Sequence, residues 1–255
     1  MKVFTVLFLA HCIGDYYLQP ESLAVRKSKN IGWTLLHCLI YAAVMGLSIL
    51  LLGGGHIWAA AACAVTHLVI DVVKQLILNS CAKRDVLTVK GERAAFCVDQ
   101  ILHIAIMIAA SIWATMSFDL VVPGWMAALK KIIGPDPYRI MAYGAMAVAA
   151  LKPANVFVRR MLVTEKPDSD NALEAERTRI GRYIGGLERL IVLALLIFGQ
   201  YGSIAIVFTA KSIARFKQLE DRDFAEYYIF GSLLSVVAAV GIFVLLRYFG
   251  AVRMR

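Results

Sequence analysis

Long apolar runs recur along the chain at intervals typical of a polytopic membrane protein. The clearest runs cover residues 31–55, 58–78 and 230–246. Each approaches or exceeds the ~20 apolar residues that a helix needs to cross a ~30 Å hydrocarbon core. Backbone amides in hydrocarbon must find partners within their own segment, so helices are expected. The pattern therefore predicts an all-α transmembrane helical bundle.

About seven membrane helices are predicted, over residues 3–18, 33–52, 57–78, 94–116, 138–151, 187–208 and 227–248. The first is interpreted as a membrane helix, since no small-residue cleavage site follows it. Three glycines at 53–55 predict a tight turn between antiparallel neighbours. The segment 125–133 lies between prolines and is expected at the membrane interface. Six spans plus a re-entrant hairpin, with its break at residues 199–202, are the alternative.

The predicted organisation is a single domain with three parts. Residues 1–151 form an N-terminal membrane bundle, 152–186 a cytoplasmic loop, and 187–255 the C-terminal membrane helices. Pro153 is expected to end the fifth helix. Within the loop, Asn171 precedes Glu174 by the spacing of a capping box, which predicts a short soluble helix.

Composition and charge support membrane insertion and set an orientation. Of 255 residues, 60% are hydrophobic and 18% charged, and the formal net charge is +9. Basic residues gather in the loops 20–32, 79–93 and 152–182, which are therefore predicted to be cytoplasmic. This charge suits contact with anionic lipid headgroups better than nucleic-acid binding. The five cysteines show no CxxC spacing and are interpreted as small buried residues in a reducing environment.

Ionisable side chains inside the apolar segments carry the functional signal. Four of the five histidines lie in predicted membrane helices. An i, i+4 spacing, which places two side chains on one helix face, recurs in three helices. The pairs are His11 with Asp15, His67 with Asp71, and Asp99 with His103, and His37 lies on a fourth helix.

All four helices place these groups in the cytoplasmic half of the membrane, so the groups are expected to meet. A charged side chain in hydrocarbon costs at least ~2.5 kcal/mol, so such residues face the bundle interior and mark a site. A bound divalent metal compensates the cost, and imidazole with carboxylate suits zinc first, with iron or manganese as alternatives. A structural hydrogen-bond network and a proton or ion pathway remain as alternatives. The predicted metal ligands are His11, Asp15, His67, Asp71, Asp99 and His103.

Further polar groups are candidates for substrate contact. Lys74 continues the face of His67 and Asp71, and can neutralise an aspartate or bind an anionic headgroup. Arg182, Glu188 and Arg189 lie at the predicted cytoplasmic boundary of the sixth helix. They are predicted to hold a phosphate or lipid headgroup, with snorkelling or a local ion pair as the alternative.

Two stretches of sequence resemble an uncharacterised family of bacterial membrane proteins, known by a domain-of-unknown-function label. The opening stretch matches HxxGDxxLQ at residues 11–19, and a later one matches GRxIGxLER at residues 181–189. The resemblance implies a multi-pass protein of the bacterial inner membrane and supplies no reaction. A looser analogy of chemistry is to alkaline ceramidases, whose HxxxH pair is absent here.

The leading hypothesis is an intramembrane metal-dependent hydrolase that acts on a lipid or lipid-linked substrate at the cytoplasmic leaflet. A spare carboxylate among Asp15, Asp71 and Asp99 would act as the general base on a metal-bound water, and His37 as a ligand or oxyanion donor. One alternative is a metal-ion or proton-coupled transporter. Another is a non-catalytic membrane subunit with a structural polar core.

Overall fold

The computed structural model describes residues 2–52, 56–119, 121–162 and 172–250. The described residues form helices, with no strand among them. Within these described ranges, five helices are long and apolar enough to cross a membrane. They are Ile31–Leu52, Ile57–Lys83, Val89–Ser117, Pro137–Leu162 and Arg222–Tyr248. An all-α membrane protein is therefore supported, whereas the predicted number of seven spans is not confirmed.

The chain divides into two compact units, one built around Met1–Ala145 and the other around Met146–Leu245. The division falls inside α8 (Pro137–Leu151), shortly before the predicted end of the N-terminal bundle. The first unit also contains the short helices α4 (Ile49–Leu52) and α7 (Gly124–Ile133). The helix α7 agrees with the segment predicted for the interface.

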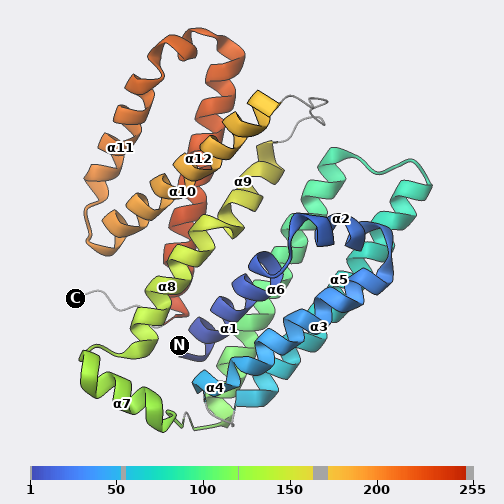
Figure 1. The fold of residues 1–255 in the computed structure, drawn as a ribbon, viewed down its shortest axis with the longest axis vertical. Coiled ribbons are helices and arrows are strands. Elements are labelled where there is room, and N and C mark those ends of the chain that lie inside the picture. Colours follow the sequence, from blue (N-terminus) through green and yellow to red (C-terminus); the bar gives the residue numbers. More distant parts are fainter. Residues whose placement is uncertain (1, 53–55, 120, 163–171, 251–255) are drawn as a thin grey trace. The chain divides into compact units, whose positions relative to one another are not determined.

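The long helices of the first unit lie side by side (Figure 1). Helix α3 (Ile31–Leu47) packs on α5 (Ile57–Lys83), and α5 packs on α6 (Val89–Ser117). Helix α1 (Lys2–His11) contacts both α3 and α6. Helix α2 (Glu21–Lys29) packs on α3. The four helices that carry the predicted His and Asp residues are therefore neighbours.

The first predicted helix changes its winding after His11. Residues Cys12–Tyr17 form a π-helix, η1, and the Leu18 N–H donates to the carbonyl of Ile13 at 2.9 Å. The expected regular helix over 3–18 is therefore wrong in its last part. Gly14 contributes to the change, because a Cβ there would lie 3.0 Å from Cδ2 of Tyr41. The backbone of η1 can thus approach α3 closely. Short π-helical segments are frequent at functional sites.

The described part of the second unit contains helix interruptions at Pro153 and near Gly199. The helix continues after the expected stop at Pro153 as α9 (Pro153–Leu162), since a proline is tolerated in the first turn. The predicted sixth span is interrupted between α10 (Ala172–Ile197) and α11 (Tyr201–Ala214). Gly199 there has a φ of +72°, a conformation that favours glycine.

The hairpin alternative therefore describes this segment better than a full span, and α11 packs on α10. The segment predicted as a short soluble helix belongs to the start of α10. The proposed cap Asn171 and the glycine turn at 53–55 lie outside the described residues. The turn η3 (Phe216–Glu220) leads into the final helix, α12 (Arg222–Tyr248).

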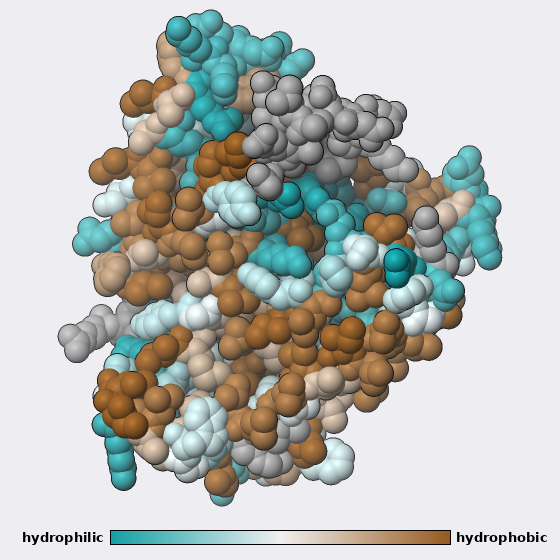
Figure 2. All heavy atoms as spheres, in the orientation of Figure 1, coloured by the Kyte–Doolittle hydropathy of each residue, from teal (hydrophilic) through white to brown (hydrophobic). Residues whose placement is uncertain are grey.

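The surface of the first unit separates apolar and polar regions along the helices. Figure 2 shows hydrophobic residues over α3, and hydrophilic residues at the turn that joins α5 to α6. Exposed large hydrophobic side chains on α3 and α5 include Leu39, Leu47, Trp58 and Val65. This distribution is typical of a bundle whose sides face lipid.

The contact of Gly14 with Tyr41 gives a test of the bundle. The change Gly14→Ala is expected to destabilise the protein by about 1–3 kcal/mol, because the added Cβ overpacks a buried ring. The melting temperature in detergent measures the effect. The matched control is Gly46→Ala, where the new Cβ meets nothing within 4 Å. Equal losses in the two variants would contradict the described packing of η1 on α3.

Candidate metal centre

Helix α3 presents one buried face to the centre of the first unit. Its buried residues are Thr34, His37, Cys38, Tyr41 and Met45. Their spacing of three or four residues per step places them on one side of the helix. On α5, His67, Asp71 and Gln75 are buried in the same manner.

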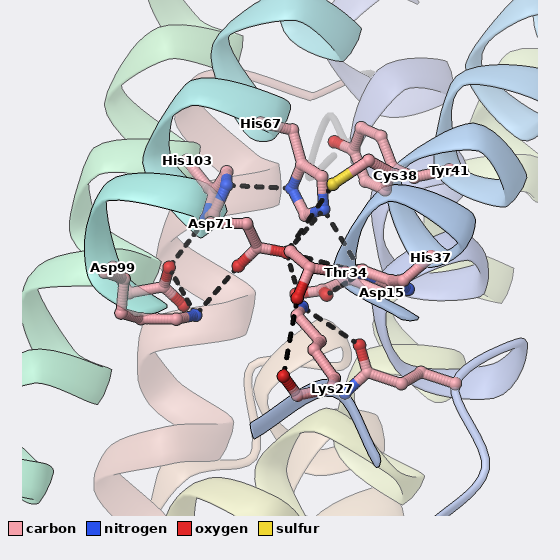
Figure 3. A network of polar contacts seen from close by, with 12 residues as sticks. Asp15, Lys27, Thr34, His37, Cys38, Tyr41, His67, Asp71, Asp99 and His103 are labelled. Carbon is pink, nitrogen blue, oxygen red and sulfur yellow. Dashed lines mark hydrogen bonds and ion pairs between the residues drawn. The ribbon is translucent and has the colours of Figure 1, made fainter. Parts of the chain in front are cut away.

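Two histidines and two carboxylates converge where α3, α5 and η1 meet (Figure 3). The Nε2 atoms of His37 and His67 lie 3.2 Å apart. Nε2 of His37 lies 3.2 Å from Oδ1 of Asp15, and Nε2 of His67 lies 3.3 Å from Oδ2 of Asp71. Oδ2 of Asp71 is also 3.7 Å from Nε2 of His37. Nitrogen and oxygen atoms from α3, α5 and η1 therefore lie within one small volume.

These spacings fit a tetrahedral metal ion. Zinc binds imidazole nitrogen and carboxylate oxygen at about 2.0–2.2 Å, so neighbouring tetrahedral ligands lie about 3.3–3.6 Å apart. The ligand atoms of Asp15, His37 and His67 all lie within 4.8 Å of one another. Three protein ligands with one open position are typical of catalytic zinc sites.

Cys38 belongs to a second set of three that shares His67. The ligand atoms of Cys38, His67 and Asp71 also lie within 4.8 Å of one another. The Sγ of Cys38 is 4.0 Å from Oδ2 of Asp71. From the sequence, Cys38 was interpreted as a small buried residue. Its position next to His37, on the same face of α3 as Thr34 and Tyr41, was the signal that could have marked it as a possible ligand.

His103 and Asp99 approach the centre from the other side of His67. Nδ1 of His67 and Nε2 of His103 are 2.8 Å apart, and Nδ1 of His103 lies 3.8 Å from Oδ1 of Asp99. Metal-binding histidines usually use their second nitrogen for such a contact, which fixes the ring. Both residues were predicted as ligands, and the structure instead places His103 against His67 and Asp99 against His103 and Lys74.

His11 contacts Tyr41 within the same cluster. Its Nδ1 lies 3.1 Å from the Tyr41 hydroxyl. The Tyr41 ring stacks on the ring of His67, with centroids 3.7 Å apart and an interplanar angle of 9°. The centroids of the His11 and His67 rings are 6.5 Å apart. His11, also a predicted ligand, therefore holds the tyrosine that covers His67.

Two lysines neutralise the carboxylates at the edge of the cluster. Lys74 pairs through Nζ with Oδ1 of Asp71 at 2.9 Å and with Oδ1 of Asp99 at 2.8 Å. Lys27 pairs with Oδ2 of Asp71. The sequence hypothesis assigned Lys27 to a basic cytoplasmic loop, because no periodic pattern connects it with Asp71.

Helix α2 is fixed in place by hydrogen bonds around its last turn. The Gln75 Nε2 donates to the carbonyl of Lys27 at 2.7 Å, and the Thr34 hydroxyl donates to Oε1 of Gln75 at 2.5 Å. Thr34 is fully buried. These bonds hold the backbone of Lys27 while its side chain reaches Asp71.

The residues predicted to bind a headgroup near the sixth helix lie in the second unit and have other contacts. Arg189 is only 2% exposed. It donates to the carbonyl of Ala150 at 2.7 Å, to the Ser235 hydroxyl at 3.1 Å and to the side-chain carbonyl of Asn155. Pro153 lacks an N–H and interrupts the helical hydrogen bonds nearby, so Arg189 stabilises this break.

The other two members of this group also lie in the second unit. Glu188 accepts a hydrogen bond from Nζ of Lys211 at 2.8 Å, and Lys211 also donates to Ser232. Arg182 is exposed. The structure thus gives Glu188 and Arg189 partners within the second unit, and their binding of a headgroup stays a prediction.

The comparisons with known proteins concern mainly the first unit. Residues 3–128 match the model of a protein family of unknown function, DUF3307. The matched segment contains the opening motif and every residue of the His and Asp cluster, whereas the GRxIGxLER stretch lies beyond it. Comparison with curated proteins and with solved structures finds no match.

The partners of Arg189 predict a large effect of its removal. The variant Arg189→Met is expected to lose about 1–3 kcal/mol of unfolding free energy, because buried acceptors lose their donor. The control is Arg222→Met, which breaks an exposed ion pair with Glu226 and is expected to have no measurable effect. Unfolding of both variants by SDS titration gives the comparison. A wild-type value for Arg189→Met would refute the role at the Pro153 break.

Proposed function

We propose that the first unit binds a divalent transition metal, zinc in first place, and uses it to hydrolyse a lipid or lipid-linked substrate. The observation that supports this most strongly is the convergence of Asp15, His37 and His67 from three elements at distances suited to a metal. The basic loops favour a cytoplasmic active side in a bacterial inner membrane.

In this proposal Asp15, His37 and His67 are the ligands and leave one position open. A zinc ion held by them would supply an activated water as nucleophile at neutral pH. Oδ2 of Asp71 faces the same volume and would accept the proton of that water as the general base. His103 and Asp99 would keep the ring of His67 in its orientation.

The arrangement supports an enzyme better than a transporter. A transport path needs polar groups on both sides of the site. On the side toward α4, the buried side chains are chiefly apolar, and the buried Ser111 hydroxyl donates to its own helix at the carbonyl of Met107. The apolar residues on this side are Phe4, Leu7, Met45, Ala59, Ala60, Met107, Ala110 and Ala114. Among the described residues of the cluster, the Lys74 side chain is 25% exposed, whereas those of His37, His67 and Asp71 are buried.

Metal content tests the ligand set directly. Wild-type protein purified without chelator is expected to hold about one zinc ion per chain. His67→Gln and Asp15→Asn are expected to lose at least about tenfold in zinc affinity, because each removes a ligand. Asp71→Asn should retain the metal, since Asp71 is the base. The matched control is Asp136→Asn, which changes a surface partner of Lys2. A zinc-free wild type would contradict the proposal, and loss of zinc in Asp71→Asn would favour the set with Cys38.

Hydrolysis is tested with the zinc-loaded protein in a bacterial lipid extract made up in ¹⁸O-water. Mass spectrometry is expected to find a product that contains ¹⁸O. Asp71→Asn should lower its rate by about 10²–10⁴-fold while the protein stays folded, because the general base is lost. Zinc flux across vesicles without any labelled product would contradict the enzyme and favour transport. If the ligand variants His67→Gln and Asp15→Asn bind no metal but unfold with wild-type stability, a purely structural role of the cluster is excluded.

A further inference from the structure

The charges of the cluster point to the kind of substrate. Three carboxylates, those of Asp15, Asp71 and Asp99, face two ammonium groups, those of Lys27 and Lys74. With neutral histidines, one negative charge remains in excess. A divalent cation reverses the balance to one positive charge, which a buried site does not hold without a counter-ion. The metal-loaded centre would therefore attract an anion.

The two lysines lie where such an anion would enter. The side chain of Asp71 is 1% exposed, whereas that of Lys27 is 12% and that of Lys74 is 25% exposed. The two lysine side chains are thus more accessible than the carboxylate of Asp71 to which they are paired. Nζ of Lys27 also lies 3.4 Å from the side-chain oxygen of Gln19, which precedes α2 in the chain. A cationic headgroup would meet two positive charges at this entrance.

Apolar side chains surround the entrance on α5. Val73 and Ile77 stand on either side of Lys74 in the sequence and are 47% and 55% exposed. Tyr17 and Leu18, at the end of η1, are exposed as well. An ammonium group among exposed apolar side chains suits an amphiphile whose charged group enters the cluster while its acyl chains stay in the membrane.

We propose that the substrate carries a phosphate group, which Lys27 and Lys74 bind beside the metal. This inference rests on the proposed function and specifies its substrate class. Lysine ammonium groups are strong phosphate binders and act as mobile point charges. Each lysine now donates to Asp71, so a phosphate that takes up their donors would also release the carboxylate for its role as base.

The test measures binding of ³²P-labelled inorganic phosphate to the full-length protein in maltoside detergent, with zinc and without it. Zinc-loaded wild type is expected to bind phosphate at least about tenfold more tightly than the zinc-free protein. Lys27→Met and Lys74→Met should each bind it about tenfold more weakly while retaining zinc. Lys83→Met, an exposed lysine on the same helix, is the control and should bind as wild type does.

A competition arm identifies the source of the phosphate. If dihexanoyl phosphatidic acid displaces the label at a much lower concentration than free phosphate does, the substrate phosphate belongs to a lipid. If the two compounds are equally potent, it belongs to a soluble molecule. Zinc-loaded protein that binds no labelled phosphate would overturn the inference and leave the metal site intact. Unchanged binding in both lysine variants would overturn it as well. A wild type without zinc would instead refute the proposed function, before any phosphate is added.

Discussion

The carboxylate of Asp71 is the constraint on which the first unit depends. It is almost completely buried in an apolar bundle, where an uncompensated charge is costly. Its partners come from α2, α3 and α5, through Lys27, His37, His67 and Lys74. Lys74 extends the network to α6 by its contact with Asp99. The packing of these helices and the formation of the site therefore depend on each other, because separating any of the helices would leave a charged side chain without its ion-pair partner.

Much of this network was predictable because helical spacing links residues on one face. The i, i+4 pairs on α5 and α6 and the matched depth of the four helices indicated a single cluster. Lys27 was not predictable, since it reaches Asp71 from a separate short helix. The π-helix was not either, because it depends on the close approach of Gly14 to Tyr41, a tertiary contact. This winding places Asp15 beside His37, so the ligand set differs from one drawn with a regular helix.

The second unit shows the limits of apolar runs as evidence for spans. Hydrophobicity reports where a segment can lie in lipid, whereas continuity depends on single residues. Gly199 allows the chain to turn within an apolar run. At Pro153 a new helix begins, and its direction depends on the residues that pack against it. Arg189 donates to the carbonyl of Ala150 beside this break and to two further polar side chains, which accounts for the burial of its side chain there. Its partners lie far apart in the sequence, so spacing could not reveal them.

The central claim is that imidazole and carboxylate groups of the first unit coordinate a metal. Zinc K-edge X-ray absorption of the purified protein tests it most directly. The bound zinc is expected to have nitrogen and oxygen neighbours at about 2.0–2.1 Å, with the outer scattering pattern of two imidazole rings. A spectrum of water oxygens alone, without imidazole scattering, would contradict the claim and mark the zinc as loosely bound.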